Sequence, residues 1–149
     1  MVDVGAKEVT ARTATAEAYV VMSPSAQALI RTGAAKKGDV LATAQIAGML
    51  AAKRTAQLIP LCHPLELSHI DVRCEPLGDD RIRIRCSVAC EARTGAEMEA
   101  LMGCAVAALT VYDMAKAADR AMSIERLMLV EKKGGKSGHY RRNNRDRTR

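Results

Sequence analysis

The stretch TGAEMEALMGCAVAALTVYDMAKAA, residues 94–118, decides the fold because it predicts one long helix against which the rest of the chain packs. Thr94 and Glu97 have the three-residue spacing of a capping box, in which each side chain bonds a backbone amide at the helix start. Apolar residues coat more than one face of this helix, which is typical of a helix in a core or an interface. Its many alanines allow another helix or a sheet to approach closely.

Two charged residues stand out on this apolar helix. Asp113 and Lys116 are three residues apart, so their side chains share one helix face. Burying a charge is costly unless the charge is paired. The spacing alone leaves two interpretations open: a structural ion pair near the helix end, or an acid–base pair in which each group shifts the pKa of the other.

Another carboxylate follows the same stripe of the helix. Glu99 precedes Asp113 by two steps of seven residues. The helical rise separates the two by roughly 21 Å, which is too far for a nucleotide-sized ligand to touch both in one chain. If both serve one site, two subunits contribute to it with their long helices antiparallel, and the protein is an obligate oligomer.

The rest of the chain predicts strands and shorter helices from its periodicity and its turn residues. In chain order, the predicted elements are an irregular segment at 1–14, a strand at 17–22, a helix from Ser23 and Pro24 to Gly33, a helix from Asp39 to about Gln57, strands at 68–74 and 81–91 joined by a turn at 78–80, the long helix, and a strand near 123–130. Ser23 and Asp39 are the predicted N-caps of the two shorter helices.

This order, β-α-α-β-β-α-β, becomes β-α-β-β-α-β when the extra helix is set aside, which is the ferredoxin-like arrangement. We therefore predict an α+β fold: an antiparallel four-stranded sheet with helices on one face, plus one additional helix. The domain covers residues 1–140. Residues 141–149 carry no apolar side chain to bury, so we expect a basic, disordered tail.

Composition narrows the protein class. The chain has no Phe or Trp and three Tyr, so the core must be aliphatic and rich in Ala and Met. The five cysteines form no CxxC pair, and the start of the chain has no apolar run like that of a secretory signal. We expect a cytoplasmic protein with reduced thiols. No apolar run approaches the roughly 20 residues of a membrane span, so we expect no membrane partner.

The formal charge of +6 comes from one end of the chain. From Lys132 onward there are eight Lys or Arg and one Asp, a net +7, which leaves −1 for the rest. A basic tail on a ferredoxin-like sheet is compatible with RNA binding, but such domains stack bases on sheet aromatics. The outward strand positions have none, so we expect no nucleic-acid partner.

Two loops carry reactive or charged side chains. Pro60 and Pro64 bracket a loop with Cys62 beside His63, which is either a thiol–imidazole site or an ordinary stiff loop. KKGGKSG, residues 132–138, offers free amides and three lysines to a phosphate, although it lacks Walker A spacing. A flexible basic segment is the other interpretation. Cys86 and Cys90 share a strand face with aliphatic residues, so we expect core packing and no metal site.

Several motifs, in order along the chain, resemble those of one known family. They are MVDVGAK at 1–7, KKGDVLATAQIAG at 36–48, LIPLCHPLELSHIDV at 58–72, TGAEMEAL at 94–101, AALTVYDMAKA at 107–117 and KKGGKSG at 132–138. Over residues 1–140 the chain thus resembles the MoaC family, the cyclic pyranopterin monophosphate synthases of molybdenum cofactor biosynthesis. The resemblance does not extend to residues 141–149.

The resemblance implies a lyase of the molybdopterin pathway. Its substrate is (8S)-3′,8-cyclo-7,8-dihydroguanosine 5′-triphosphate, which is rearranged to the pterin product, cyclic pyranopterin monophosphate, with release of pyrophosphate. The implied assembly is a homohexamer, a trimer of dimers, with the active site at the dimer interface. No cofactor is implied as required, and binding of Mg²⁺ to the pyrophosphate is left open.

The resemblance also implies roles for residues that match the motifs. Asp113 matches the catalytic aspartate, with Lys116 as its partner and Lys37 as another essential lysine. The implied substrate-binding residues are Leu61, Cys62, His63, Glu97, Met98, Glu99, Lys132 and Lys136. The departures are Ala115 and Lys133, where the family often has Cys and Ser, and neither removes a charged group.

These residues suit the implied chemistry. A carboxylate–lysine pair and a histidine can supply proton transfers, and lysines can hold a leaving pyrophosphate. The order of the proton transfers is left open. The alternative is a noncatalytic ferredoxin-like nucleotide-binding or regulatory module that returns the triphosphate unchanged. The Asp113–Lys116 pair favours the enzyme, because phosphate binding alone has no use for a carboxylate.

Overall fold

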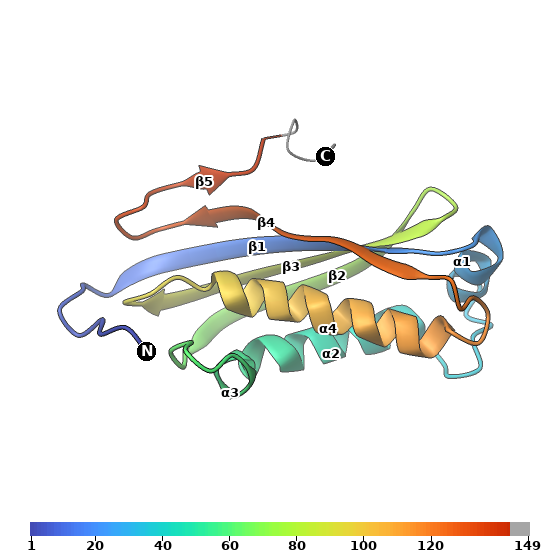
Figure 1. The fold of residues 1–149 in the computed structure, drawn as a ribbon, viewed down its shortest axis with the longest axis horizontal. Coiled ribbons are helices and arrows are strands. Elements are labelled where there is room, and N and C mark those ends of the chain that lie inside the picture. Colours follow the sequence, from blue (N-terminus) through green and yellow to red (C-terminus); the bar gives the residue numbers. More distant parts are fainter. Residues whose placement is uncertain (144–149) are drawn as a thin grey trace.

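An antiparallel sheet carries two long helices side by side across one of its faces (Figure 1). The computed structural model describes residues 1–143 of the chain, and residues 144–149 lie outside the described part. The elements in chain order are β1 (Thr10–Val21), α1 (Pro24–Arg31), α2 (Val40–Lys53), α3 (Thr55–Leu58), β2 (Leu67–Leu77), β3 (Arg81–Ala92), α4 (Glu97–Ala115), β4 (Ser123–Lys133) and β5 (Tyr140–Arg141).

The strand order across the sheet is β2-β3-β1-β4-β5, and all neighbouring pairs are antiparallel. The first four strands have the connectivity of the predicted ferredoxin-like fold, so the predicted α+β fold with an additional helix is confirmed. The predicted number of four strands is wrong by one short strand. In β5, Tyr140 pairs with Lys132 and Arg141 with Glu131. Two residues are too few to give a periodic signal in the sequence.

Small side chains on the inner face of the sheet bring the helices close. β1 contributes Ala14, Ala16 and Ala18, all fully buried. β3 contributes the alternating residues Ile82, Ile84, Cys86, Val88 and Cys90, as its pattern predicts. Helices with long side chains at these contacts would stand further from the sheet. The aliphatic, alanine-rich core follows from the lack of large aromatic residues.

Two glycines allow the closest contacts of α2 and α4. A Cβ on Gly48 of α2 would lie 2.8 Å from the backbone oxygen of Gly103 in α4. A Cβ on Gly103 would overlap the Sγ of Cys86 in β3. Both glycines have ordinary helical backbones, so it is space and not conformation that requires glycine there.

We expect Gly103→Ala to lower the free energy of unfolding by about 1–3 kcal/mol, because overpacking outweighs the gain of about 1 kcal/mol that alanine brings to an open helix position. Urea denaturation at one fixed protein concentration measures the change. In a Cys86→Ala background the same substitution should cost less, because the Sγ is gone. A stabilised Gly103→Ala variant would contradict this packing.

Three predicted boundaries were wrong. β1 begins at Thr10, within the segment predicted to be irregular at 1–14. The predicted second helix is interrupted at Arg54, with α3 as a separate turn. The capping box is wrong too: α4 begins at Glu97, its N-cap is Ala96, and no side chain caps it.

The two predicted helix caps were correct. The Ser23 and Asp39 side chains cap α1 and α2 by accepting from the amides of Ala26 and Ala42. Of the predicted tail, Arg141 lies in β5 and Asn143 is the last described residue, so most of that prediction falls outside the described residues.

By length and composition alone, the helix α4 is long and apolar enough to cross a membrane. Eight of its residues are buried against the sheet and α2, among them Ala100, Cys104 and Val111. A core helix of a folded domain passes the same test.

Candidate active site

Three charged side chains meet at the C-terminal end of α4. Asp113 lies in the last turn of α4, and Lys37 comes from the loop between α1 and α2. The Lys37 Nζ donates to Asp113 Oδ2 at 2.6 Å, and the Lys116 Nζ donates to Asp113 Oδ1 at 2.7 Å. Lys37 also donates to the Asp113 backbone oxygen at 3.1 Å, where the helix end favours a cation. The carboxylate is therefore held between two ammonium groups, which we call the lysine–aspartate cluster.

The cluster is half-exposed in the single chain, with 54% of the Asp113 side chain accessible. Hydrogen bonds from Lys116 and then Lys37 lower the pKa of Asp113 from 3.8 to about 2. The same contact raises the pKa of Lys116. Asp113 and Lys116 are thus both charged at neutral pH. A carboxylate bonded by two ammonium groups is a weak base, and it becomes a stronger one when either lysine turns to another anion.

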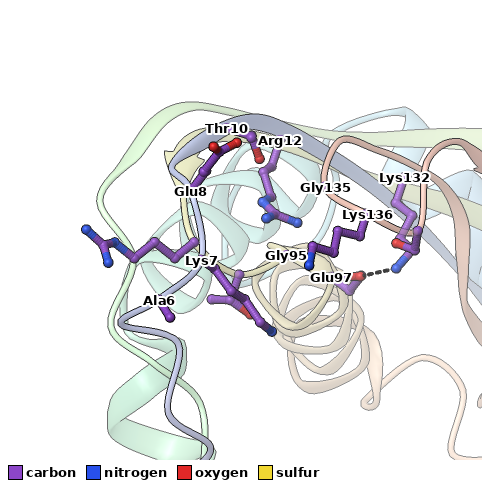
Figure 2. Close-up of a pocket in the computed structure, with 13 residues that line it drawn as sticks. Ala6, Lys7, Glu8, Thr10, Arg12, Gly95, Glu97, Lys132, Gly135 and Lys136 are labelled. Atoms are coloured by element: carbon purple, nitrogen blue, oxygen red, sulfur yellow. Dashed lines mark hydrogen bonds and ion pairs between the residues drawn. The ribbon is translucent and has the colours of Figure 1, made fainter.

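A cavity of about 820 Å³ opens at the other end of α4. Figure 2 shows its lining side chains, which come from the N-terminal segment, β1, the β3–α4 loop, β4 and the loop after β4. Five cationic residues line it: Lys7, Arg12, Arg93, Lys132 and Lys136. The lining carboxylates are Glu8 and Glu97. The excess of positive charge suits a polyanion, and we call this cavity the cationic pocket.

The two carboxyls near the start of α4 differ in their surroundings. Lys132 donates to Glu97 at 2.7 Å. Burial raises the pKa of Glu97, but this hydrogen bond and the nearby charges outweigh it, so the net pKa is lowered. Glu99 is only 4% exposed, and burial, with the charge of Glu97 as a lesser cause, raises its pKa. Neighbouring carboxyls with opposite shifts are typical of sites where one group holds a proton and the other a charge.

The Cys62–His63 loop is only partly joined to these groups. Burial and then the charge of Glu99 raise the pKa of the Cys62 thiol, so a thiolate nucleophile is disfavoured. Leu61 is 70% exposed, while Cys62 and His63 are half-buried. Within residues 1–143, no hydrogen bond or ion pair links His63 to the lysine–aspartate cluster or to the residues of the cationic pocket.

The residues singled out from the sequence therefore fall into two sets. Lys37, Asp113 and Lys116 form one set at the end of α4. Glu97, Lys132 and Lys136 line the cationic pocket at its start, near Glu99 and Cys62, with Met98 half-buried on the same turn as Glu97 and Glu99. Asp113 follows Glu97 by sixteen residues, which is about 24 Å of helix, so one chain does not bring the two sets together.

Sequence reasoning missed three cations of the pocket: Lys7, Arg12 and Arg93. Arg12 had a signal, because it is in phase with Ala14, Ala16 and Ala18 on the inner face of β1. A charged residue at the inward end of a strand calls for a partner or a ligand. The signal was lost because the start of β1 was predicted to be irregular.

Among the residues that the structure describes, no group of three or more His, Cys, Asp or Glu side chains is arranged to hold a metal ion. All five cysteines are free.

A model of the MoaC family matches residues 1–135, which is most of the chain. The chain belongs to the MoaC family. Among its MoaC relatives, cyclic pyranopterin monophosphate synthase 3 of Mycobacterium bovis is 58% identical over 146 residues, covering 98% of this chain and 82% of the relative. The synthase of a Methylobacterium strain is 60% identical over 141 residues, covering 94% and 88%. A second Mycobacterium bovis relative, synthase 1, is 56% identical over 142 residues, covering 95% and 84%.

Proposed function

We propose that this MoaC protein is a cyclic pyranopterin monophosphate synthase, a lyase of molybdenum cofactor biosynthesis. It rearranges 3′,8-cyclo-7,8-dihydroguanosine triphosphate to cyclic pyranopterin monophosphate and releases pyrophosphate. The observation that carries the proposal is the pair of charged sites on α4: a carboxylate between two lysines at one end, and a cationic pocket at the other. Relatives with this activity in their names support it.

The lysine–aspartate cluster would serve the ring chemistry. Opening and reclosing purine-derived rings needs several proton transfers, and Asp113 with Lys116 offers a base and an acid within hydrogen-bonding distance. When a phosphate oxygen of the substrate draws Lys37 away, Asp113 loses one of its two hydrogen bonds and gains basicity. Binding of the substrate and activation of the base are then the same event.

The cationic pocket would hold the polyphosphate. Closing a cyclic phosphate with loss of pyrophosphate builds negative charge on the leaving group, which fixed cations stabilise. Lys132 and Lys136 line the pocket, and Glu97 holds Lys132 in place until the ligand arrives. Glu99, with its raised pKa, is a buried carboxyl able to donate a proton beside it. We propose Cys62, His63 and Met98 as further substrate contacts, with Leu61 held beside them.

One functional site would need two chains. About 24 Å of helix separates Asp113 from Glu97, more than a nucleotide of this size bridges with its reacting end and its phosphates. Antiparallel packing of two α4 helices brings the start of one next to the end of the other. We therefore propose sites at a dimer interface within a homohexamer. Exposed apolar residues on α2 and α4, such as Ile46 and Leu109, are available for contacts between chains.

We propose a cytoplasmic protein that needs no cofactor and contacts neither nucleic acid nor a membrane. Whether Mg²⁺ accompanies the pyrophosphate is decided by adding EDTA to the turnover assay.

Turnover tests the function directly. The purified chain is incubated with the cyclic dihydroguanosine triphosphate, and the pterin product and pyrophosphate are followed together. We expect equal amounts of both products. Tight binding of the triphosphate without either product would refute the synthase and favour the nucleotide-binding module.

A further inference from the structure

The loop after β4 folds back onto the edge of β1 and carries Lys136 into the cationic pocket. Gly134 and Gly135 both have left-handed backbones, with φ of +99° and +72°. The amide of Gly138 donates to the Gly135 oxygen at 3.1 Å and closes the turn around Lys136. The place of the Lys136 ammonium therefore depends on how this turn is seated.

Gly135 is seated directly against the guanidinium of Arg12. A Cβ on Gly135 would overlap the Arg12 Nη1 and lie 2.8 Å from its Cζ. A Cβ on Gly134 would overlap the backbone oxygen of Ala11. Gly138 has the same left-handed backbone, with φ of +64°, but nothing lies within 4 Å of a Cβ there. The crowding is thus specific to the two glycines next to β1.

Arg12 is itself fixed by the neighbouring strand. Its Nε donates to the Ala92 backbone oxygen at the end of β3, at 3.1 Å. The side chain is half-buried, and its head points from β1 toward the side of the pocket where Lys136 lies (Figure 2). The planar head thus offers the glycine turn a flat, oriented surface, which a lysine does not.

We propose that Arg12 is a positioning residue of the cationic pocket: its guanidinium, fixed by Ala92, is the seat of Gly135 and thereby sets where Lys136 meets a polyphosphate. The inference rests on the proposed function, since it assigns a polyphosphate to this pocket. It adds a residue to which no motif gave a role, and it gives glycine at 135 a steric reason in addition to its left-handed backbone. A side chain there displaces the turn, and Lys136 with it.

Binding of inorganic pyrophosphate, measured by calorimetry on the full chain, tests whether Arg12 positions Gly135 and Lys136. We expect Gly135→Ala to weaken binding by about tenfold or more, because displacing the turn misplaces a binding group. Gly138→Ala is the matched control: it adds the same methyl to the same kind of backbone but meets no atom, so we expect a change within about twofold. Equal losses in the two variants would overturn the proposal, since backbone strain would then explain both.

Arg12 variants complete the test. Arg12→Lys keeps the charge but loses the planar head and the Ala92 bond, and we expect it to weaken pyrophosphate binding by about fivefold or more. In an Arg12→Ala background, Gly135→Ala should cost much less than in the wild type, because the clash is gone. Wild-type affinity in Arg12→Lys would overturn the positioning role of Arg12. An undiminished effect of Gly135→Ala in the Arg12→Ala background would overturn it too. Melting temperatures accompany each variant. We expect Gly135→Ala and Gly138→Ala both to lower the melting temperature, because both strain a left-handed backbone, and only Gly135→Ala to lose affinity.

The inference and the proposed function fail in different ways. If the protein does not turn over the triphosphate but its pyrophosphate binding depends on Arg12 and Gly135, the proposed function is refuted and the positioning role of Arg12 stands. If the protein turns over the triphosphate but neither residue affects pyrophosphate binding, the function stands and the positioning role is refuted. A wild-type protein that binds no pyrophosphate would overturn the inference.

Discussion

Asp113→Asn lowers kcat/KM for the cyclic dihydroguanosine triphosphate by about 10²–10⁴-fold, the range expected when a general acid–base group is removed. The amide still fills the space of the carboxylate and can still accept a hydrogen bond from Lys37 or Lys116. It cannot take up a proton, and it no longer balances the two ammonium charges. We therefore expect the loss in kcat rather than in folding, because the cluster is half-exposed and no core residue depends on it.

Asp71→Asn is the control for this experiment. Asp71 is also a surface carboxylate in an ion pair, with Arg73 at 2.8 Å, and it lies on β2 away from both charged sites. It should keep wild-type turnover. Circular dichroism and size-exclusion chromatography check that both variants keep their fold and oligomeric state. Turnover by Asp113→Asn within about twofold of the wild type would return the Asp113–Lys116 pair to the structural interpretation, while the enzyme itself would stand.

The sequence predicted the structure correctly where the local residue pattern agrees with what the whole fold requires. Alternation in β3 predicted Ile82, Ile84 and Cys86 as inward residues, and all three are fully buried. Ser23 and Asp39 cap their helices as predicted, because an N-cap is decided within four residues. The element order then left few topologies, and the ferredoxin-like one is observed.

The sequence failed where a residue's partner is distant in the chain. Glu97 has the spacing of a capping box with Thr94, yet its carboxylate accepts from Lys132, 35 residues away. The Glu97 carboxylate can either cap the helix locally or pair with a lysine that is distant in the sequence, and only the fold decides between the two. Lys37 is a similar case: its contact with Asp113 spans 76 residues and comes from a loop with no periodic pattern.

The alanine-rich β1 shows how an inward pattern is missed. Four of the twelve residues of Thr10–Val21 are Ala, which is depleted in strands, and its valines come only at the end, so its first half resembled a loop. Small side chains are selected there because α4 packs directly over β1. The propensity scale describes average surroundings, whereas β1 is the central strand of the sheet and has α4 packed on it.

Two inactive variants should restore activity when they assemble together. Asp113→Asn removes the carboxylate of the lysine–aspartate cluster, and Lys132→Met removes a cation of the pocket at the other end of α4. If each site takes one end of α4 from each of two chains, a mixed dimer has one intact site and one doubly altered site. Random co-assembly then makes half the dimers mixed and about a quarter of all sites intact, so we expect about a quarter of wild-type activity.

Co-expression with two different affinity tags, followed by purification on both, yields assemblies that contain both variants. The matched control is the pair Asp113→Asn and Lys116→Met. Both changes lie in the same cluster, so every mixed dimer has one altered residue in each site, and we expect no recovery. Recovery in the first pair and none in the second requires a site built from opposite ends of two helices. No recovery in the first pair would place both ends of α4 in one chain's site, which the length of α4 opposes. Lys132→Met is also assayed alone, because an active Lys132→Met would mean that Lys132 serves no step, and activity of the mixture would then need no shared site.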